Sequence, residues 1–178
     1  HQEIELGLVK LYEATGEERY LRLAAYFLLE RGKQPFYYDI EAKASGEEAD
    51  GMKSFFRTHG TDPYSYQQSH KPVLEQTEAV GHAVREGYML AAMADVAALT
   101  GDETLLAATR VLYDDIVNCQ MYITGGVGSM GDGEAFTFDY DIPNDRMYTE
   151  TCASISLLMT AQRLLNIAPQ GKYADVCE

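Results

Sequence analysis

Basic side chains are scarce in this chain. Its 14 lysines and arginines stand against 28 acidic residues, which gives a formal net charge of −14 at pH 7. This balance argues against binding to nucleic acids or to anionic membranes, and it is compatible with uncharged substrates such as sugars. No hydrophobic run approaches the roughly 20 apolar residues that a membrane span needs. No secretory signal is visible, although the chain does not begin with methionine.

Cysteine is also rare, and the three present are widely spaced: Cys119, Cys152 and Cys177. An odd, scattered set is not a disulfide framework, so we expect a reducing compartment and a cytoplasmic protein. A phosphate-binding loop is missing as well. The glycines of 125–128 lack the lysine and the strand-to-helix context of such a loop.

The length of 178 residues suffices for one domain with a buried core. Both ends fall inside helical sequence, since His1 opens directly into a helix and Cys177 lies in one that is only starting. We therefore expect 1–178 to be one partial domain from a longer chain.

Apolar residues at helical spacing predict five helices and the start of a sixth. The expected bounds are 2–14, 18–31, 77–99, 103–117, 150–166 and 172–178. From 33 to 74 no period is sustained, which indicates a long connection with one short helix. Within it, 46–51 is typical of a solvated excursion and Asp62-Pro63 of a turn.

An internal repeat predicts the architecture. Segments 8–21 and 93–106 share a helix, a Thr-Gly-acid-Glu turn and a second helix, and 163–176 is a looser third copy. Helical hairpins with short turns on one side and long connections on the other indicate an all-α toroid. A tetratricopeptide-like solenoid is the alternative, but such solenoids repeat at about 34 residues with little inserted.

The long insertions near 33–76 and 118–148 lie on the same side of this toroid. The first helix of each hairpin begins on that side too. Four polar residues fall near those helix starts: His1, His82, Glu150 and Cys152. We expect them to gather with the inserted loops at one rim.

The stretch 121–152 is glycine-rich in its first half and places acids among aromatic rings in its second half. Rings stack on sugar faces, and carboxylates bond hydroxyls or move protons, so this mixture suits a sugar site. A long surface loop with ordinary polar decoration is the alternative.

Individual residues allow two interpretations each. In a closed pocket beside aromatic rings, Glu134 would have a raised pKa and could act as a general acid; otherwise it is a solvated loop glutamate. Glu150 and Cys152 could ligate zinc if the positive helix end favours a thiolate, yet zinc wants about four ligands, and a buried structural cysteine is the alternative. A lone histidine such as His82 or His1 is more often an ordinary core or surface residue.

Three further acids, Asp139, Asp141 and Asp145, could bind calcium, but they lack the regular loop pattern, and caps or turn bonds explain them more simply. His59 and His70 lie in the irregular connection, and we assign them no role.

Long motifs in this chain closely resemble glycoside hydrolase family 127, whose characterised members include β-L-arabinofuranosidases. The motifs are HQEIELGLVKLYEATGEERYL (1–21), GHAVREGYMLAAMADVAALTGDE (81–103), MYITGGVGS (121–129), GEAFTFDYDIPND (133–145) and YTETCASI (148–155).

The resemblance implies that the chain is the middle part of an (α/α)6-barrel catalytic domain. It implies that Glu134 is the general acid/base and that Glu150 and Cys152 are zinc ligands. It also implies that His82 and His1 line the sugar subsite. The implied chemistry is retaining, with a zinc-bound cysteine thiolate as nucleophile instead of the usual second carboxylate.

The family pattern places two adjacent cysteines, one of them the nucleophile, far downstream of the Glu-Thr-Cys motif. This chain has no such pair, because Cys177 is solitary and comes too early, and Cys119 has no functional match. We therefore expect the chain to be inactive alone and to bind zinc weakly or not at all. Exposed helix faces of an incomplete ring favour a homo-oligomer.

The leading hypothesis is a glycosidase that removes β-L-arabinofuranose from plant-derived glycans. A non-catalytic helical carbohydrate-binding or scaffold module is one alternative, and a related hydrolase for another sugar is the other.

Overall fold

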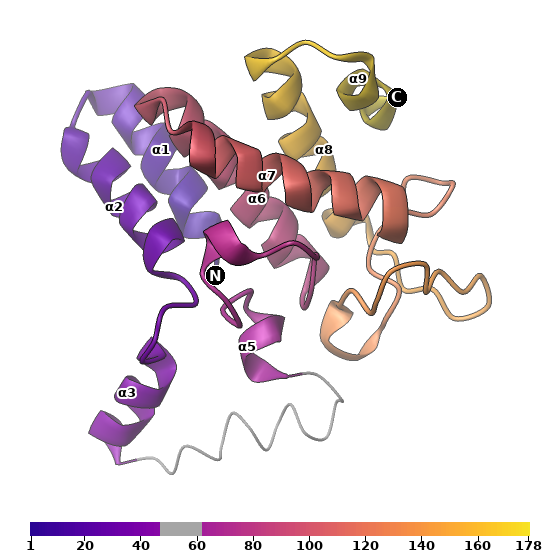
Figure 1. Ribbon diagram of the computed structural model, residues 1–178, viewed down its shortest axis with the longest axis horizontal. Helices are drawn as coiled ribbons and strands as arrows, with labels where there is room; N and C mark the ends of the chain where they lie inside the picture. Colours follow the sequence, from indigo (N-terminus) through magenta and orange to yellow (C-terminus); the bar gives the residue numbers. More distant parts are fainter. Residues whose placement is uncertain (47–61) are drawn as a thin grey trace.

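The computed structural model describes residues 1–46 and 62–178, and helices dominate these ranges. Extended pairing within them is limited to three isolated bridges. The principal helices are α1 (Glu3–Thr15), α2 (Glu18–Glu30), α6 (Ala83–Thr100), α7 (Glu103–Asp115), α8 (Thr151–Ile167) and α9 (Gly171–Cys177). They form three hairpins, α1–α2, α6–α7 and α8–α9 (Figure 1). None of the described helices is both long and apolar enough to cross a membrane.

The first two hairpins turn in the same way. Gly16 and Gly101 end α1 and α6 with φ of 72°, and each donates its N–H to a carbonyl four residues earlier, at 2.8 and 2.9 Å. Glycine tolerates this left-handed conformation without a steric penalty. The preceding threonines, Thr15 and Thr100, also hydrogen-bond the carbonyl four residues before them. These matching turns confirm the repeat.

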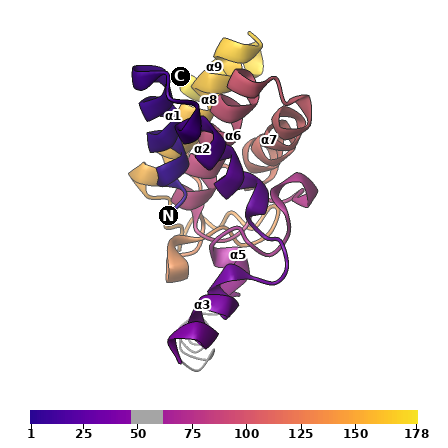
Figure 2. The same ribbon diagram turned by 90° about the vertical axis from the view of Figure 1, so that its left-hand side faces the viewer.

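Helix α6 lies between α1 and α8 and is the most buried element (Figures 1 and 2). Small side chains allow α6 and α8 to approach closely. A Cβ on Gly87 would lie 2.0 Å from Ser156 Oγ, and the Thr160 hydroxyl donates to the Gly87 carbonyl at 3.0 Å. The first helix of each hairpin therefore packs on the first helix of the next. The three hairpins form part of an all-α toroid, as the sequence predicted.

The short hairpin turns lie at one end of the helices, and the long connections lie at the end where α1, α6 and α8 begin (Figure 1). The first connection contains more helix than expected: α3 (Tyr37–Ser45), α5 (Pro63–Tyr66) and the 3-10 turn η1 (Val73–Glu75). The predicted turn at Asp62-Pro63 begins α5, where the Asp62 carboxylate accepts from Ser65 N–H at 2.7 Å. The excursion predicted at 46–51 lies, after Gly46, outside the described residues.

Two helix bounds differ from the sequence prediction. The helix expected at 77–99 begins only at Ala83, because Gly81 has φ of 72° and sits where a Cβ would lie 2.0 Å from the Ser65 carbonyl oxygen. The helix expected at 103–117 ends at Asp115 and continues as a π-helical turn, η2 (Ile116–Gln120). The other bounds agree within one residue.

Apolar side chains remain exposed on the two outer members of the row α1–α6–α8. Ile4 and Leu11 on α1, and Ile155 and Leu158 on α8, are each 40% or more exposed. The expected homo-oligomer would use such faces and stays a prediction. All three cysteines are free. The cytoplasmic location stays a prediction as well.

Candidate active site

The residues predicted to gather at one rim do lie there together. His1 precedes α1 by two positions, His82 and Glu150 are the N-cap residues of α6 and α8, and Cys152 is the second residue of α8. The rings of His1 and His82 are 6.5 Å apart in an edge-on arrangement. The charges of Glu134 and Glu150 both act on His82.

Backbone bonds hold the Glu134 loop against the start of α6. Met130 and Ala135 exchange two N–H···O bonds of 3.1 and 2.9 Å, and Phe136 N–H donates to the Gly81 carbonyl at 2.9 Å. Glu134 lies in the short 3-10 turn η3 (Asp132–Glu134) with φ of 51°, a left-handed conformation that is uncommon for a residue with a side chain. Such strain is often found at functional sites.

The Glu134 carboxylate is held at both oxygens. His82 Nε2 donates to Oε2 at 2.9 Å, and the Tyr148 hydroxyl donates to Oε1 at 3.0 Å. The side chain is nevertheless 43% exposed, so the closed pocket expected around it is not formed by the described residues. A carboxylate that is fixed in place and open to solvent can exchange a proton with a ligand.

Both partners of Glu134 are hydrogen-bond donors near neutral pH. Burial, followed by the Arg85 guanidinium, lowers the pKa of His82, and the carboxylates nearby do not outweigh these effects. Hydrogen bonds to Glu134 and Glu150 raise the pKa of Tyr148, so its phenol stays protonated. The sequence indicates Tyr148 only as one of the aromatic rings of 121–152 that suit a sugar site, since no spacing rule connects it with Glu134, 14 residues away.

A second strained residue precedes α8. Thr149 has φ of 40°, and its N–H donates to the Gly128 carbonyl at 2.9 Å. A Cβ on Gly126 would lie 2.9 Å from the Thr149 Cβ. The glycines of this loop therefore permit close backbone approach, which sets how Glu150 enters the helix.

Glu150 and Cys152 face each other, and the Cys152 thiol donates to Glu150 Oε1 in a very short contact. This bond raises the pKa of the thiol, while the backbone N–H groups of the helix start act in the opposite direction with smaller effect. The sequence predicts that the positive helix end favours a thiolate. The structure corrects this, because the adjacent carboxylate outweighs the helix end.

A buried network of glutamines positions the two histidines. Gln68 Nε2 donates to the carbonyls of Val80, at 2.8 Å, and of His82, at 3.2 Å. Its Oε1 accepts from the amide of Gln2, which is next to His1 in the chain. Gln68 and Gln2 are almost completely buried. Gln68 thus connects the starts of α1 and α6, a role that the sequence did not indicate.

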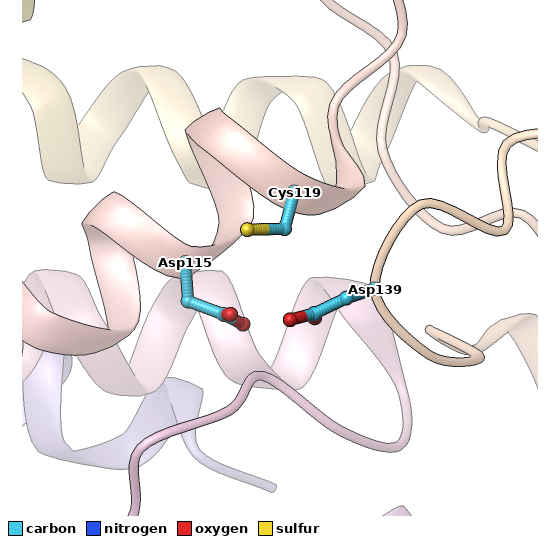
Figure 3. A group of neighbouring side chains, drawn as sticks. All are labelled: Asp115, Cys119 and Asp139. Carbon is cyan, nitrogen blue, oxygen red and sulfur yellow. The ribbon is translucent and has the colours of Figure 1, made fainter.

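Another group of ligand-type side chains lies outside this rim. Ligand atoms of Asp115, Cys119 and Asp139 lie within 4.8 Å of one another (Figure 3). Asp115 accepts from Ala79 N–H at 2.8 Å, and Tyr140 N–H donates to the Cys119 carbonyl at 2.8 Å. The Asp115 bond fastens the segment before α6 to the end of α7, and the Tyr140 bond fastens the loop after Glu134 to η2.

The acids considered as calcium ligands do not come together in the described part of the chain. Only Asp139 belongs to a cluster of ligand-type residues there, and Asp141 pairs instead with Arg146 at 3.5 Å. Of the two histidines without a role, His59 lies outside the described residues. His70 is half-buried, and burial lowers its pKa.

The fold is part of a helical toroid, and its rim holds a fixed carboxylate, two histidines and a thiol, which are side-chain types that acid–base chemistry uses. The family model for the β-L-arabinofuranosidase GH127 catalytic domain matches residues 1–178. The chain belongs to glycoside hydrolase family 127.

Known relatives agree with this assignment. The non-reducing end β-L-arabinofuranosidase of Bifidobacterium longum subsp. longum is 46% identical over 178 residues, which are 100% of this chain and 26% of the relative. A GH127 β-L-arabinofuranosidase from Geobacillus stearothermophilus superposes with a TM-score of 0.91 at 53% identity, covering 99% of this chain and 27% of that chain. A further GH127 β-arabinofuranosidase has a TM-score of 0.80 at 42% identity, with coverages of 98% and 23%. The chain thus spans about a quarter of the length of these relatives.

Proposed function

We propose that this chain is part of the catalytic domain of a retaining glycoside hydrolase that removes β-L-arabinofuranose from plant-derived glycans. The observation that carries the proposal is the Glu134 carboxylate, which His82 and Tyr148 hold at the rim shared with Glu150 and Cys152. The β-L-arabinofuranosidase relatives from Bifidobacterium longum and Geobacillus stearothermophilus support the choice of sugar.

In this proposal Glu134 moves the protons. It protonates the oxygen of the leaving group as the glycosidic bond breaks, and it then takes a proton from the water that releases the sugar. The bonds from His82 Nε2 and the Tyr148 hydroxyl keep the carboxylate in one position during both steps. His82 and His1 line the place of the furanose ring.

Zinc fits the remaining rim residues in part. Glu150 and Cys152 supply one oxygen and one sulfur donor in direct contact, which is half of a four-ligand site. Among the described residues, no third His, Cys, Asp or Glu places a ligand atom within 4.8 Å of both Glu150 and Cys152. When bound, zinc would favour the thiolate form of its cysteine ligands near neutral pH. The nucleophile would come from a part of the protein outside this chain.

The test is Glu134→Gln in the complete protein. We expect kcat on a β-L-arabinofuranosyl disaccharide to fall by roughly 10²- to 10⁴-fold, because the leaving sugar oxygen needs a proton. The kcat on a 4-nitrophenyl β-L-arabinofuranoside should fall less, since the nitrophenolate can leave without being protonated. Binding of arabinose should persist, because the amide keeps the shape of the side chain.

Equal turnover by the variant and the wild type would rule out Glu134 as the acid/base. A protein that binds arabinofuranosides without hydrolysing them would instead be a binding module, and hydrolysis of other glycosides only would indicate a related hydrolase. For the 178-residue chain alone we expect no turnover of the aryl arabinofuranoside. Turnover by the chain alone would show that the nucleophile lies within it.

A further inference from the structure

A cavity of about 440 Å³ opens beside His1. Its walls come from the first turn of α1, the second half of α2 and the segment that leads into α3. In both ribbon views α3 lies beyond the end of the α1–α2 hairpin at which the chain begins (Figures 1 and 2). The aromatic residues that line it are Tyr26, Phe27, Phe36, Tyr37 and Tyr38.

Two of these rings are unusually accessible. Tyr26 is 58% exposed and Tyr37 is 66% exposed, and they belong to different elements, α2 and α3. Cavities that bind small molecules combine apolar and aromatic walls with a few polar groups. Each ring offers a flat face to a sugar and a hydroxyl to its oxygen atoms.

The charged groups of the cavity neutralise one another. Arg31 pairs with the fully buried Glu5 at 3.1 Å, and Lys33 pairs with Glu30 at 2.7 Å. The side chains that line the cavity include all four of these charges. Because neither sign is left in excess, the cavity suits an uncharged ligand with hydroxyl groups better than an anionic glycan.

The cavity adjoins the catalytic rim through His1. The His1 ring forms part of the cavity wall and lies 6.5 Å from the ring of His82, whose Nε2 is 2.9 Å from the Glu134 carboxylate. Two histidine side chains thus separate the cavity from the acid. The cavity therefore borders the place proposed for the furanose ring.

We propose that this cavity is a subsite for the leaving-group side of the substrate, where Tyr26 and Tyr37 bind an uncharged sugar beyond the arabinofuranose that is removed. The assignment rests on the proposed hydrolase function. It predicts that the cavity contributes to catalysis only when the substrate extends past the scissile bond.

The test compares Tyr26→Ala and Tyr37→Ala with wild type in the complete protein, on an arabinofuranosyl trisaccharide and on the aryl arabinofuranoside. We expect kcat/KM on the trisaccharide to fall about tenfold in each variant, and kcat/KM on the aryl substrate to change less than twofold. Leu23→Ala is the matched control. Leu23 is 40% exposed on the same helix and does not line the cavity, so neither substrate should be affected.

Unchanged trisaccharide hydrolysis in both tyrosine variants would overturn the subsite while leaving the hydrolase function standing. An equal loss on both substrates would also overturn it, since the rings would then support the fold or pack against another part of the protein. If wild type hydrolyses neither arabinofuranoside, the proposed function itself fails, and the subsite fails with it.

Discussion

Glu86 on α6 is a fully buried carboxyl group, and its substitution tests the packing of the toroid. The residue is fully buried, and neither carboxylate oxygen has a hydrogen-bond partner among the described residues. Burial raises the pKa of Glu86 from 4.5 to about 8, with Arg31 acting in the lowering direction and Asp115 in the raising direction. The carboxyl group therefore keeps its proton in the folded protein at neutral pH.

The raised pKa has a definite sign for stability. Between pH 4.5 and 8 the folded state holds a proton that the unfolded state has released, so the free energy of unfolding decreases as the pH rises through this window. At pH 7, which is about 2.5 pH units above the ordinary value, the loss relative to acidic pH is about 3 kcal/mol at 1.36 kcal/mol per unit. Glu86→Gln removes the ionisable group and keeps its shape, so it removes this loss.

We expect Glu86→Gln to match wild type in stability near pH 4.5 and to exceed it by about 3 kcal/mol at pH 7. Urea unfolding followed by circular dichroism at four pH values between 4.5 and 8 measures the difference. Other groups with raised pKa values, such as Glu5 and Asp115, are present in both proteins, so their contributions cancel in the difference between the two unfolding free energies. Glu103→Gln, at an exposed position of α7, is the control and should change little. A difference between Glu86→Gln and wild type that does not vary with pH would refute the reasoning.

Three further predictions concern the rim and the helix contacts. Tyr148→Phe should lower kcat about tenfold, because the Glu134 carboxylate loses one of its two hydrogen-bond donors. The melting temperature of the protein should not change, because the position is exposed. Gln68→Leu should reduce the urea-unfolding free energy by about 1–3 kcal/mol, since it removes the side-chain bonds to the Val80 and His82 carbonyls and to the Gln2 amide; an unchanged value would contradict the network. Gly87→Ala should destabilise by about 1–3 kcal/mol, because its Cβ would collide with α8. Gly7→Ala, with open space around it, should stabilise by up to about 1 kcal/mol, and similar effects at both glycines would disprove close packing.

Much of the fold was predictable because its signals are local. The Thr-Gly turns at Gly16 and Gly101 need only a glycine in the left-handed region and a hydrogen bond within the last helical turn. The start of α6 was predicted six residues too early, because the apolar pattern before Ala83 does not reveal that Gly81 fits against the Ser65 carbonyl. A contact between segments that are far apart in the chain produces no periodic pattern in the sequence.

For the site, too, the sequence identified the residues but not the contacts between them. The motifs around Glu134, Glu150 and Cys152 identified the candidates, and the helix starts indicated a common rim. The hydrogen bonds that determine their chemistry depend on the packed fold. Tyr148 and Glu134, 14 residues apart, meet through a side-chain hydrogen bond, and the adjacent Glu150 carboxylate raises the pKa of the Cys152 thiol.

The sequence by itself determined the helices, the hairpin turns and the family, since helical bonds and turns join near neighbours and the motifs are contiguous. Only the tertiary structure decided which donors hold the acid, how Gln68 connects two helix starts, and that a neutral cavity opens beside His1. The physical reason is that these features arise where segments far apart in the chain meet, and their geometry depends on the packing of α1, α6 and α8.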